Sequence, residues 1–177
     1  NYLDRQALSV LADTVKRDLG LSAADYADIN SAFLLAYMVM YLVGGWIVDR
    51  IGTRRSFLLF ASAWSLATMA HGLVSSLRGF QGARLLLGAT QPVNFPAGVR
   101  AVAEWFPMRE RALAIGLFNA GTALGSTLAV PIVSAVALLA GWRWAFVIVG
   151  ASGFLWVAAW ALFYRLPKDH PRLGEDE

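Results

Sequence analysis

The stretch "GGWIVDRIGTRRS", residues 44–56, is a short run of glycine and charge between two long apolar runs at 27–48 and 56–77. Its spaced glycine and charged positions are Gly45, Asp49, Arg50, Gly52, Arg54 and Arg55. Each apolar run is long enough to cross the hydrocarbon core of a bilayer as a helix, which takes ~20 residues. The sequence therefore predicts two membrane helices joined by a tight, basic loop.

Apolar runs of the same kind extend through the rest of the chain. The five long runs lie at about 27–48, 56–77, 79–103, 112–140 and 144–164, and a sixth at the start is shorter. Of the 177 residues, 58% are hydrophobic and 15% charged, against roughly 45–50% and about 25% in soluble domains. The absence of Cys excludes disulfides and thiolate metal sites. We therefore expect an all-α membrane protein with six helices embedded in the lipid bilayer.

The basic residues are spread over the short loops and form no stripe, which argues against nucleic-acid binding. Counting the loops alternately outside and inside divides these residues unequally. One side receives Arg50, Arg54, Arg55, Arg109, Arg111, Arg165, Lys168 and Arg172, and the other receives Lys16, Arg17, Arg78 and Arg143. By the positive-inside rule the first side is cytoplasmic, so the first helix runs from inside to outside.

The connection after the first helix carries recognisable end signals. Gly20 is expected to end that helix on the outer surface. Ser22, with Asp25 three residues later, forms a variant of the capping box and is expected to start the second helix.

The ends of the sequence suggest a fragment of a longer chain. Asn1 stands in the middle of an expected helix, and the charged segment 167–177 is typical of a linker. We expect 1–166 to form a six-helix transmembrane domain with a truncated first helix, and 167–177 to begin a cytoplasmic linker, which under the resemblance described below leads to a C-terminal half. Two sets of three helices would match the inverted repeats of transporters.

Three charged side chains fall inside the expected membrane helices: Asp4, Arg5 and Arg84. A charge at the bilayer centre costs ~2.5–3.5 kcal/mol on insertion scales, so such residues usually face a bundle interior or a water-filled cavity. On a continuous fourth helix, one face would be polar and small. Its members are Arg84, Gly88, Gln91 and Gly98, with Asn94 at the edge.

Two other helices repeat this polar pattern. The second helix has Asn30, Tyr37, Tyr41 and Gly44, and the fifth has Asn119, Thr122 and Ser126. Each residue alone could be a hydrogen-bonding contact between helices, worth ~0.6 kcal/mol on average. Polar faces on the first, second, fourth and fifth helices together favour one aqueous cavity.

The loop at 44–56 resembles the signature loop between the second and third helices of the major facilitator superfamily. The stretches "NYLDRQALSV", "RLLLGATQPVNFPAGVRAVAEWFPMRERALAIGLFNAGTALGS" and "GWRWAFVIVG" are similar to the anion:cation symporter family, and most to bacterial hexuronate and sugar-acid transporters. The resemblance implies the N-terminal six-helix half of a multi-pass protein of the bacterial inner membrane. In the loop it implies a conformational latch, with close packing at Gly45 and Asp49 near the start of a neighbouring helix.

The resemblance also assigns roles to the polar residues. It makes Asp4 the proton-coupling carboxylate, whereas Gln91 stands where several relatives have Glu. Among the residues expected to bind substrate, the resemblance implies Tyr2, Arg5, Tyr37 and Arg84. The polar faces add Gln91, Asn94, Asn119 and Thr122, whose side chains suit sugar hydroxyls. The expected substrate is a small organic anion, moved with a proton or sodium and without a cofactor or metal. In the coupling hypothesis, the substrate carboxylate competes for the arginine that holds Asp4 ionised.

Other functions remain open from the sequence. Arg5 and Arg84 could clamp a phosphate in an antiporter of the same fold, although the fifth helix lacks the Gly-Pro pair typical of the antiporter motif. An intramembrane serine protease would need Ser152 and His71 within hydrogen-bonding reach. A non-transporting membrane sensor or scaffold on the same fold is a further alternative.

Overall fold

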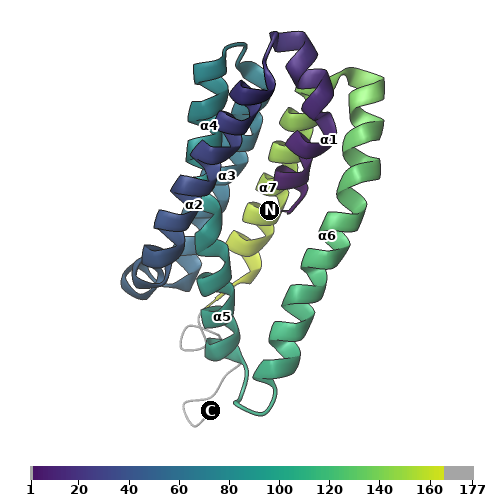
Figure 1. Ribbon diagram of the computed structural model, residues 1–177. Coiled ribbons are helices and arrows are strands. Elements are labelled where there is room, and N and C mark those ends of the chain that lie inside the picture. The colour runs from purple at the N-terminus through teal and green to yellow at the C-terminus, as the bar shows by residue number, and fades with distance from the viewer. Residues whose placement is uncertain (1, 166–177) are drawn as a thin grey trace.

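The computed structural model describes residues 2–165 as a bundle of long helices, and Figure 1 gives their arrangement. The helices are α1 (Tyr2–Leu19), α2 (Ala23–Ile51), α3 (Thr53–Leu73), α4 (Leu77–Thr90), α5 (Asn94–Trp105), α6 (Arg111–Ala140) and α7 (Trp142–Phe163), with a short 3-10 helix η1 (Gln91–Val93) between α4 and α5. No strand occurs between residues 2 and 165. The expected linker at 167–177 lies outside the described residues, as do Lys168 and Arg172 of the expected cytoplasmic side.

The helices pack in pairs along their length. The helix α3 lies along α7, α2 lies along α4, and α1 packs on α6 (Figure 1). The largest apolar cluster joins α1, α2, α4, α6 and α7 around Phe80 and Phe146. Because this cluster lies toward the end of the bundle opposite the loop at 44–56, it holds the helix ends away from that loop together.

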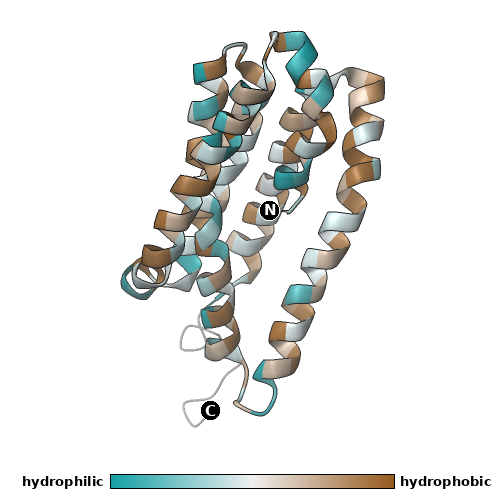
Figure 2. Ribbon diagram, viewed as in Figure 1, coloured by the Kyte–Doolittle hydropathy of each residue, from teal (hydrophilic) through white to brown (hydrophobic). Residues whose placement is uncertain are grey.

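The surface of the bundle is apolar in the way that lipid contact requires. Within residues 2–165, four helices are long and apolar enough to cross a membrane: α2, α3, α6 and α7. Figure 2 shows hydrophobic residues along α2 and α6, and large side chains such as Leu42 and Leu139 are 84% and 88% exposed. The predicted all-α membrane architecture is confirmed.

The predicted helix ends at the first connection are confirmed. Gly20 follows α1 with a φ of 64°, the left-handed region that favours glycine. The Ser22 hydroxyl accepts from the Asp25 N–H at 3.1 Å, and Asp25 Oδ2 accepts from the Ser22 N–H at 2.8 Å. This reciprocal pair is the capping box, and it orients the start of α2.

The fourth predicted helix, 79–103, differs from the structure because it is broken. The helix α4 ends at Thr90, and η1 keeps right-handed helical dihedral angles before α5 starts at Asn94. Pro92 has no N–H and its ring crowds the preceding turn, which favours the local change from α to 3-10 hydrogen bonding. The side chains after Thr90 are therefore rotated relative to the face expected for a continuous helix. The third helix also ends earlier than predicted, at Leu73.

The connection between α2 and α3 consists of Gly52 alone, with φ 82° and ψ 157°. This backbone conformation is almost exclusive to glycine and costs other residues about 1–3 kcal/mol. Its N–H still donates to the Val48 carbonyl at 2.9 Å, and its carbonyl accepts from the Ser56 N–H at 3.0 Å. Gly52 thus reverses the chain while preserving the backbone hydrogen bonds of both helix ends.

Gly52→Ala is expected to destabilise the protein by about 1–3 kcal/mol, because alanine is strained at this φ and ψ. Gly45→Ala is the matched control: it lies inside α2, and a Cβ there would meet no atom within 4 Å. Alanine favours a helix interior over glycine by about 1 kcal/mol, so the control should raise the melting temperature in detergent. Equal melting temperatures for the two variants would contradict the assignment.

Candidate functional site

Arg5 is held at the centre of the bundle by one amide and several aromatic rings. Its Nε donates to Gln91 Oε1 at 2.9 Å, across the break in the fourth span. Its guanidinium lies over the Tyr37 ring, 4.3 Å from the centroid, and 5.6 Å from that of Tyr2. These neutral partners orient the cation without cancelling its charge.

A cavity of about 210 Å³ opens beside this arginine. Its lining consists of Tyr2, Arg5, Tyr37, Tyr41, Gln91, Pro92, Asn94, Phe95, Phe118, Asn119 and Thr122. Residues predicted on four different spans therefore meet in one place. All of the predicted substrate-binding residues line it except Arg84, and their role in binding stays a prediction.

Arg84 lies outside the lining of that cavity. Only 4% of it is exposed, its guanidinium lies 5.5 Å from the centroid of the Phe33 ring, and its Nε has no hydrogen-bond partner. A buried donor without a partner is uncommon in proteins. Arg84, predicted to bind substrate, is therefore buried outside the lining of this cavity.

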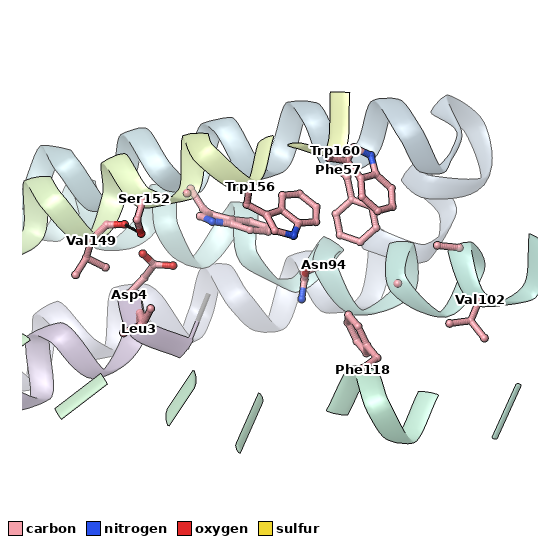
Figure 3. Close-up of a pocket in the computed structure, with 14 residues that line it drawn as sticks. Leu3, Asp4, Phe57, Asn94, Val102, Phe118, Val149, Ser152, Trp156 and Trp160 are labelled. Carbon is pink, nitrogen blue, oxygen red and sulfur yellow. Dashed lines mark hydrogen bonds between the residues drawn. The ribbon is translucent and has the colours of Figure 1, made fainter. Parts of the chain in front are cut away.

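Asp4 faces a second, larger cavity of about 470 Å³, together with Ser152 and Trp156 of α7 (Figure 3). Successive residues of a helix point about 100° apart, which sends Asp4 and Arg5 to different cavities. Asp4 is only 6% exposed. Asn94 lines both cavities, so it forms part of the wall between them.

Ser152 and His71 do not form a catalytic pair in this structure. The Ser152 hydroxyl donates to the Val149 carbonyl at 2.7 Å. His71 is fully buried, with Nδ1 2.7 Å from the Ala67 carbonyl oxygen and its ring stacked on Phe146. Within residues 2–165, no cluster of three or more His, Asp or Glu gathers to hold a metal ion.

The helix ends next to the loop at 44–56, which are predicted to be cytoplasmic, are joined by an ionic network that the sequence did not reveal. Asp49 Oδ1 pairs with Arg100 Nη1 at 2.7 Å, and Arg100 Nε pairs with Glu104 Oε1 at 3.0 Å. Arg100 Nη1 also donates to the Val48 carbonyl. The i, i+4 spacing of Arg100 and Glu104 on α5 was the available signal, but nothing local indicated that Asp49 would join them.

Glu104 connects three helices at this end of the bundle. It accepts from the Thr53 hydroxyl at 2.8 Å and from the Tyr164 hydroxyl at 2.6 Å. Burial raises the pKa of the Glu104 carboxyl, but hydrogen bonds from Tyr164, Thr53 and Arg100 outweigh it and hold that pKa below its usual range. Burial and the adjacent carboxylate raise the pKa of Tyr164, which keeps its proton on the donor.

The remaining residues of the predicted latch contact different parts of the bundle. Arg50 lies over the Trp46 ring at 4.2 Å, Arg54 donates to the Ala161 carbonyl near the end of α7, and Arg55 is exposed. The close packing expected at Gly45 is absent within residues 2–165. Asp49 pairs with the side chain of Arg100, and its expected position near the start of a neighbouring helix stays a prediction.

Known proteins share this arrangement of helices. The sequence model of the Major Facilitator Superfamily matches residues 1–177. The chain belongs to the major facilitator superfamily. A solved bacterial homologue of the human lysosomal transporter Spinster, in an inward-facing and occupied conformation, superposes with a TM-score of 0.87 at 24% identity. The superposition covers 94% of this chain and 42% of that one, and it supports the superfamily fold.

Sequence relatives in the superfamily are named as transporters of sugar acids. The chain is 37% identical to the hexuronate transporter of Escherichia coli K12 over 176 residues, which covers 99% of this chain and 41% of that protein. It is 36% identical to the galacturonate transporter of Dickeya chrysanthemi, covering 51% of it. The chain thus spans about two-fifths to half of the length of these relatives. They are transporters and not enzymes.

Asp49→Asn is expected to slow transport by the full-length protein several-fold while substrate affinity stays within about threefold. The substitution weakens the contact with Arg100, and neither Asp49 nor Arg100 lines the cavity at Arg5. Initial rates in proteoliposomes and equilibrium binding in detergent measure the two effects separately. Asp13→Asn, in an exposed pair with Lys16, is the control. Loss of binding in Asp49→Asn would refute the latch assignment.

Gln91→Glu is expected to lower the affinity for an anionic substrate by about tenfold at neutral pH. The new carboxylate would lie where Gln91 Oε1 now accepts from Arg5 at 2.9 Å, and a charge-assisted bond is worth about 1.5–3 kcal/mol. Affinity should recover as the pH falls and the carboxylate is protonated. Binding titrations across pH 5 to 8 test this, and a pH-independent affinity would exclude it.

Proposed function

We propose that the full-length protein is a secondary active transporter that imports a hexuronate or related sugar acid together with a proton. Its location would be the inner membrane of a bacterium, and alternating access would come from rocking of the two halves. The names of the relatives, hexuronate and galacturonate transporters, support this substrate class. Because the chain spans only part of those relatives, the activity belongs to the whole protein.

The observation that best supports a sugar-acid substrate is the set of residues that line the cavity at Arg5. One guanidinium fork, which suits a carboxylate, is surrounded by hydroxyls and amides from Tyr37, Asn119 and Thr122. Such groups donate and accept hydrogen bonds and so match the hydroxyls of a polyol. A sugar acid combines these two features, a carboxylate at one end and hydroxyls along the chain or ring.

Asp4 supplies the titratable group for proton coupling. Since Arg5 donates to Gln91, the hypothesis that Arg5 directly holds Asp4 ionised is revised. The two residues face separate cavities with Asn94 in the shared wall. Substrate binding at Arg5 would therefore influence Asp4 through Asn94 and through the turn of α1 that carries both residues.

Organic-phosphate antiport is the weaker candidate. A phosphate clamp would use Arg5 and Arg84 together, but Arg84 does not line the cavity. A single lining arginine favours a carboxylate over a phosphate dianion.

Uptake by the full-length protein in proteoliposomes tests the proposal. We expect accumulation of radiolabelled D-galacturonate or D-glucuronate when the outside is acidic, and its loss when a proton ionophore is added. Neutral D-galactose should not accumulate. Uptake that exchanges for internal sugar phosphate, or that needs sodium and ignores the ionophore, would reject proton symport.

Asp4→Asn is expected to abolish accumulation driven by the pH gradient, because asparagine mimics the protonated carboxyl and cannot release a proton. Substrate binding and exchange should stay within about threefold of the native protein, since Asp4 does not line the cavity at Arg5. Asp28→Asn, at an exposed position of α2, is the matched control. Proton-driven accumulation by Asp4→Asn would show that another residue carries the proton.

A further inference from the structure

The ring of Phe33 lies where two arginines from different helices converge. Arg5 of α1 places its guanidinium 5.4 Å from the ring centroid, and Arg84 of α4 places its guanidinium 5.5 Å from it. A cation near an aromatic face is attracted by the negative charge of the ring face. A single side chain of α2 therefore contacts both cations of this region.

The two arginines depend on this ring to different degrees. Arg5 also has the Gln91 amide oxygen at 2.9 Å and the Tyr37 ring at 4.3 Å. Arg84 is 4% exposed, and its Nε has no hydrogen-bond partner. The two cations therefore differ in the partners that they have beside the Phe33 ring.

The position of Phe33 is fixed by close packing of α2 on α4. A Cβ on Gly88, one turn after Arg84, would collide with the Phe33 carbonyl oxygen and lie 3.2 Å from Ala36 Cβ. The absence of a side chain at Gly88 lets the two helices approach this closely. Phe33 also packs on the buried cluster that contains Leu87, so its ring has little freedom to move.

We propose that Phe33 is a positioning residue that sets the separation of the Arg5 and Arg84 guanidiniums and thereby the affinity for the anionic substrate. Arg84 then acts on the substrate through Phe33 and Arg5, without touching it. Without the ring, the two like charges lose their common support, and Arg5 turns away from the geometry that receives a carboxylate. The inference rests on the proposed function and adds to it a residue that lies outside the lining of the cavity at Arg5.

Equilibrium binding of D-galacturonate to the purified full-length protein tests this role. Phe33→Leu should weaken binding at least fivefold, whereas Phe33→Tyr, which keeps the ring face, should stay within twofold. Phe60→Leu is the matched control, since Phe60 packs on the separate apolar cluster around Phe57, and it should stay within twofold. If Phe33→Leu fails to fold, Phe33→Met removes the ring with a similar volume and should give the same fivefold loss.

A double-mutant cycle with Arg84→Met separates positioning from general damage. In the Arg84→Met background, Phe33→Leu should weaken binding by less than twofold, because the second cation is gone. An unchanged affinity in Phe33→Leu, or an equal loss in both backgrounds, overturns the inference.

The proposed function can fail independently of this inference. If the native protein binds no hexuronate, the substrate assignment is wrong. The same double-mutant cycle can then be measured through the melting temperatures of the four proteins without substrate. Non-additive changes in melting temperature for Phe33→Leu and Arg84→Met would support the conclusion that the Phe33 ring stabilises both cations. Additive shifts would overturn it.

Discussion

A proline inside the fourth span is the constraint on which the rest of the site depends. Pro92 cannot donate a backbone hydrogen bond, and the chain passes through a short 3-10 turn in which the Asn94 N–H is shared between the carbonyls of Gln91 and Pro92. The break brings the Gln91 amide to Arg5 and sets Asn94 between two cavities. A regular helix would present these side chains along a single face.

The broken span also separates the two charged residues of α1 by environment. Arg5 enters a small polar cavity, and Asp4 enters a larger one lined in part by Trp156 and Trp160. An anion and a proton would therefore be received in different places on one rigid turn of helix. Coupling in such an arrangement relies on a shared wall and a shared backbone, and needs no direct ion pair.

Much of the fold and part of the site could be predicted because the signals are local. Apolar runs set the spans, and the capping box of Ser22 and Asp25 follows from two neighbouring residues. The cost of burying charge predicted that polar residues of several helices would share a cavity. Pro92 was visible in the sequence. The 3-10 segment that it accompanies could not be predicted, since prolines are also tolerated in continuous membrane helices.

Tertiary partners could not be predicted in this way. The pairing of Asp49 with Arg100 joins residues far apart in sequence, and several other arginines stood nearer along the chain. The position of Arg84 behind Phe33 depends on how closely α2 and α4 approach, which Gly88 decides. The open surroundings of Gly45 likewise follow from packing that a local pattern does not encode.

The neutral surroundings of Arg5 have a consequence for the unloaded half of a transport cycle. This cation contacts an amide oxygen and the face of Tyr37, and neither partner carries a formal charge. The guanidinium is solvated by the protein and keeps its full attraction for an incoming anion. A carrier built in this way can return empty without first acquiring a counter-ion, and it meets its next cargo with no competitor to displace.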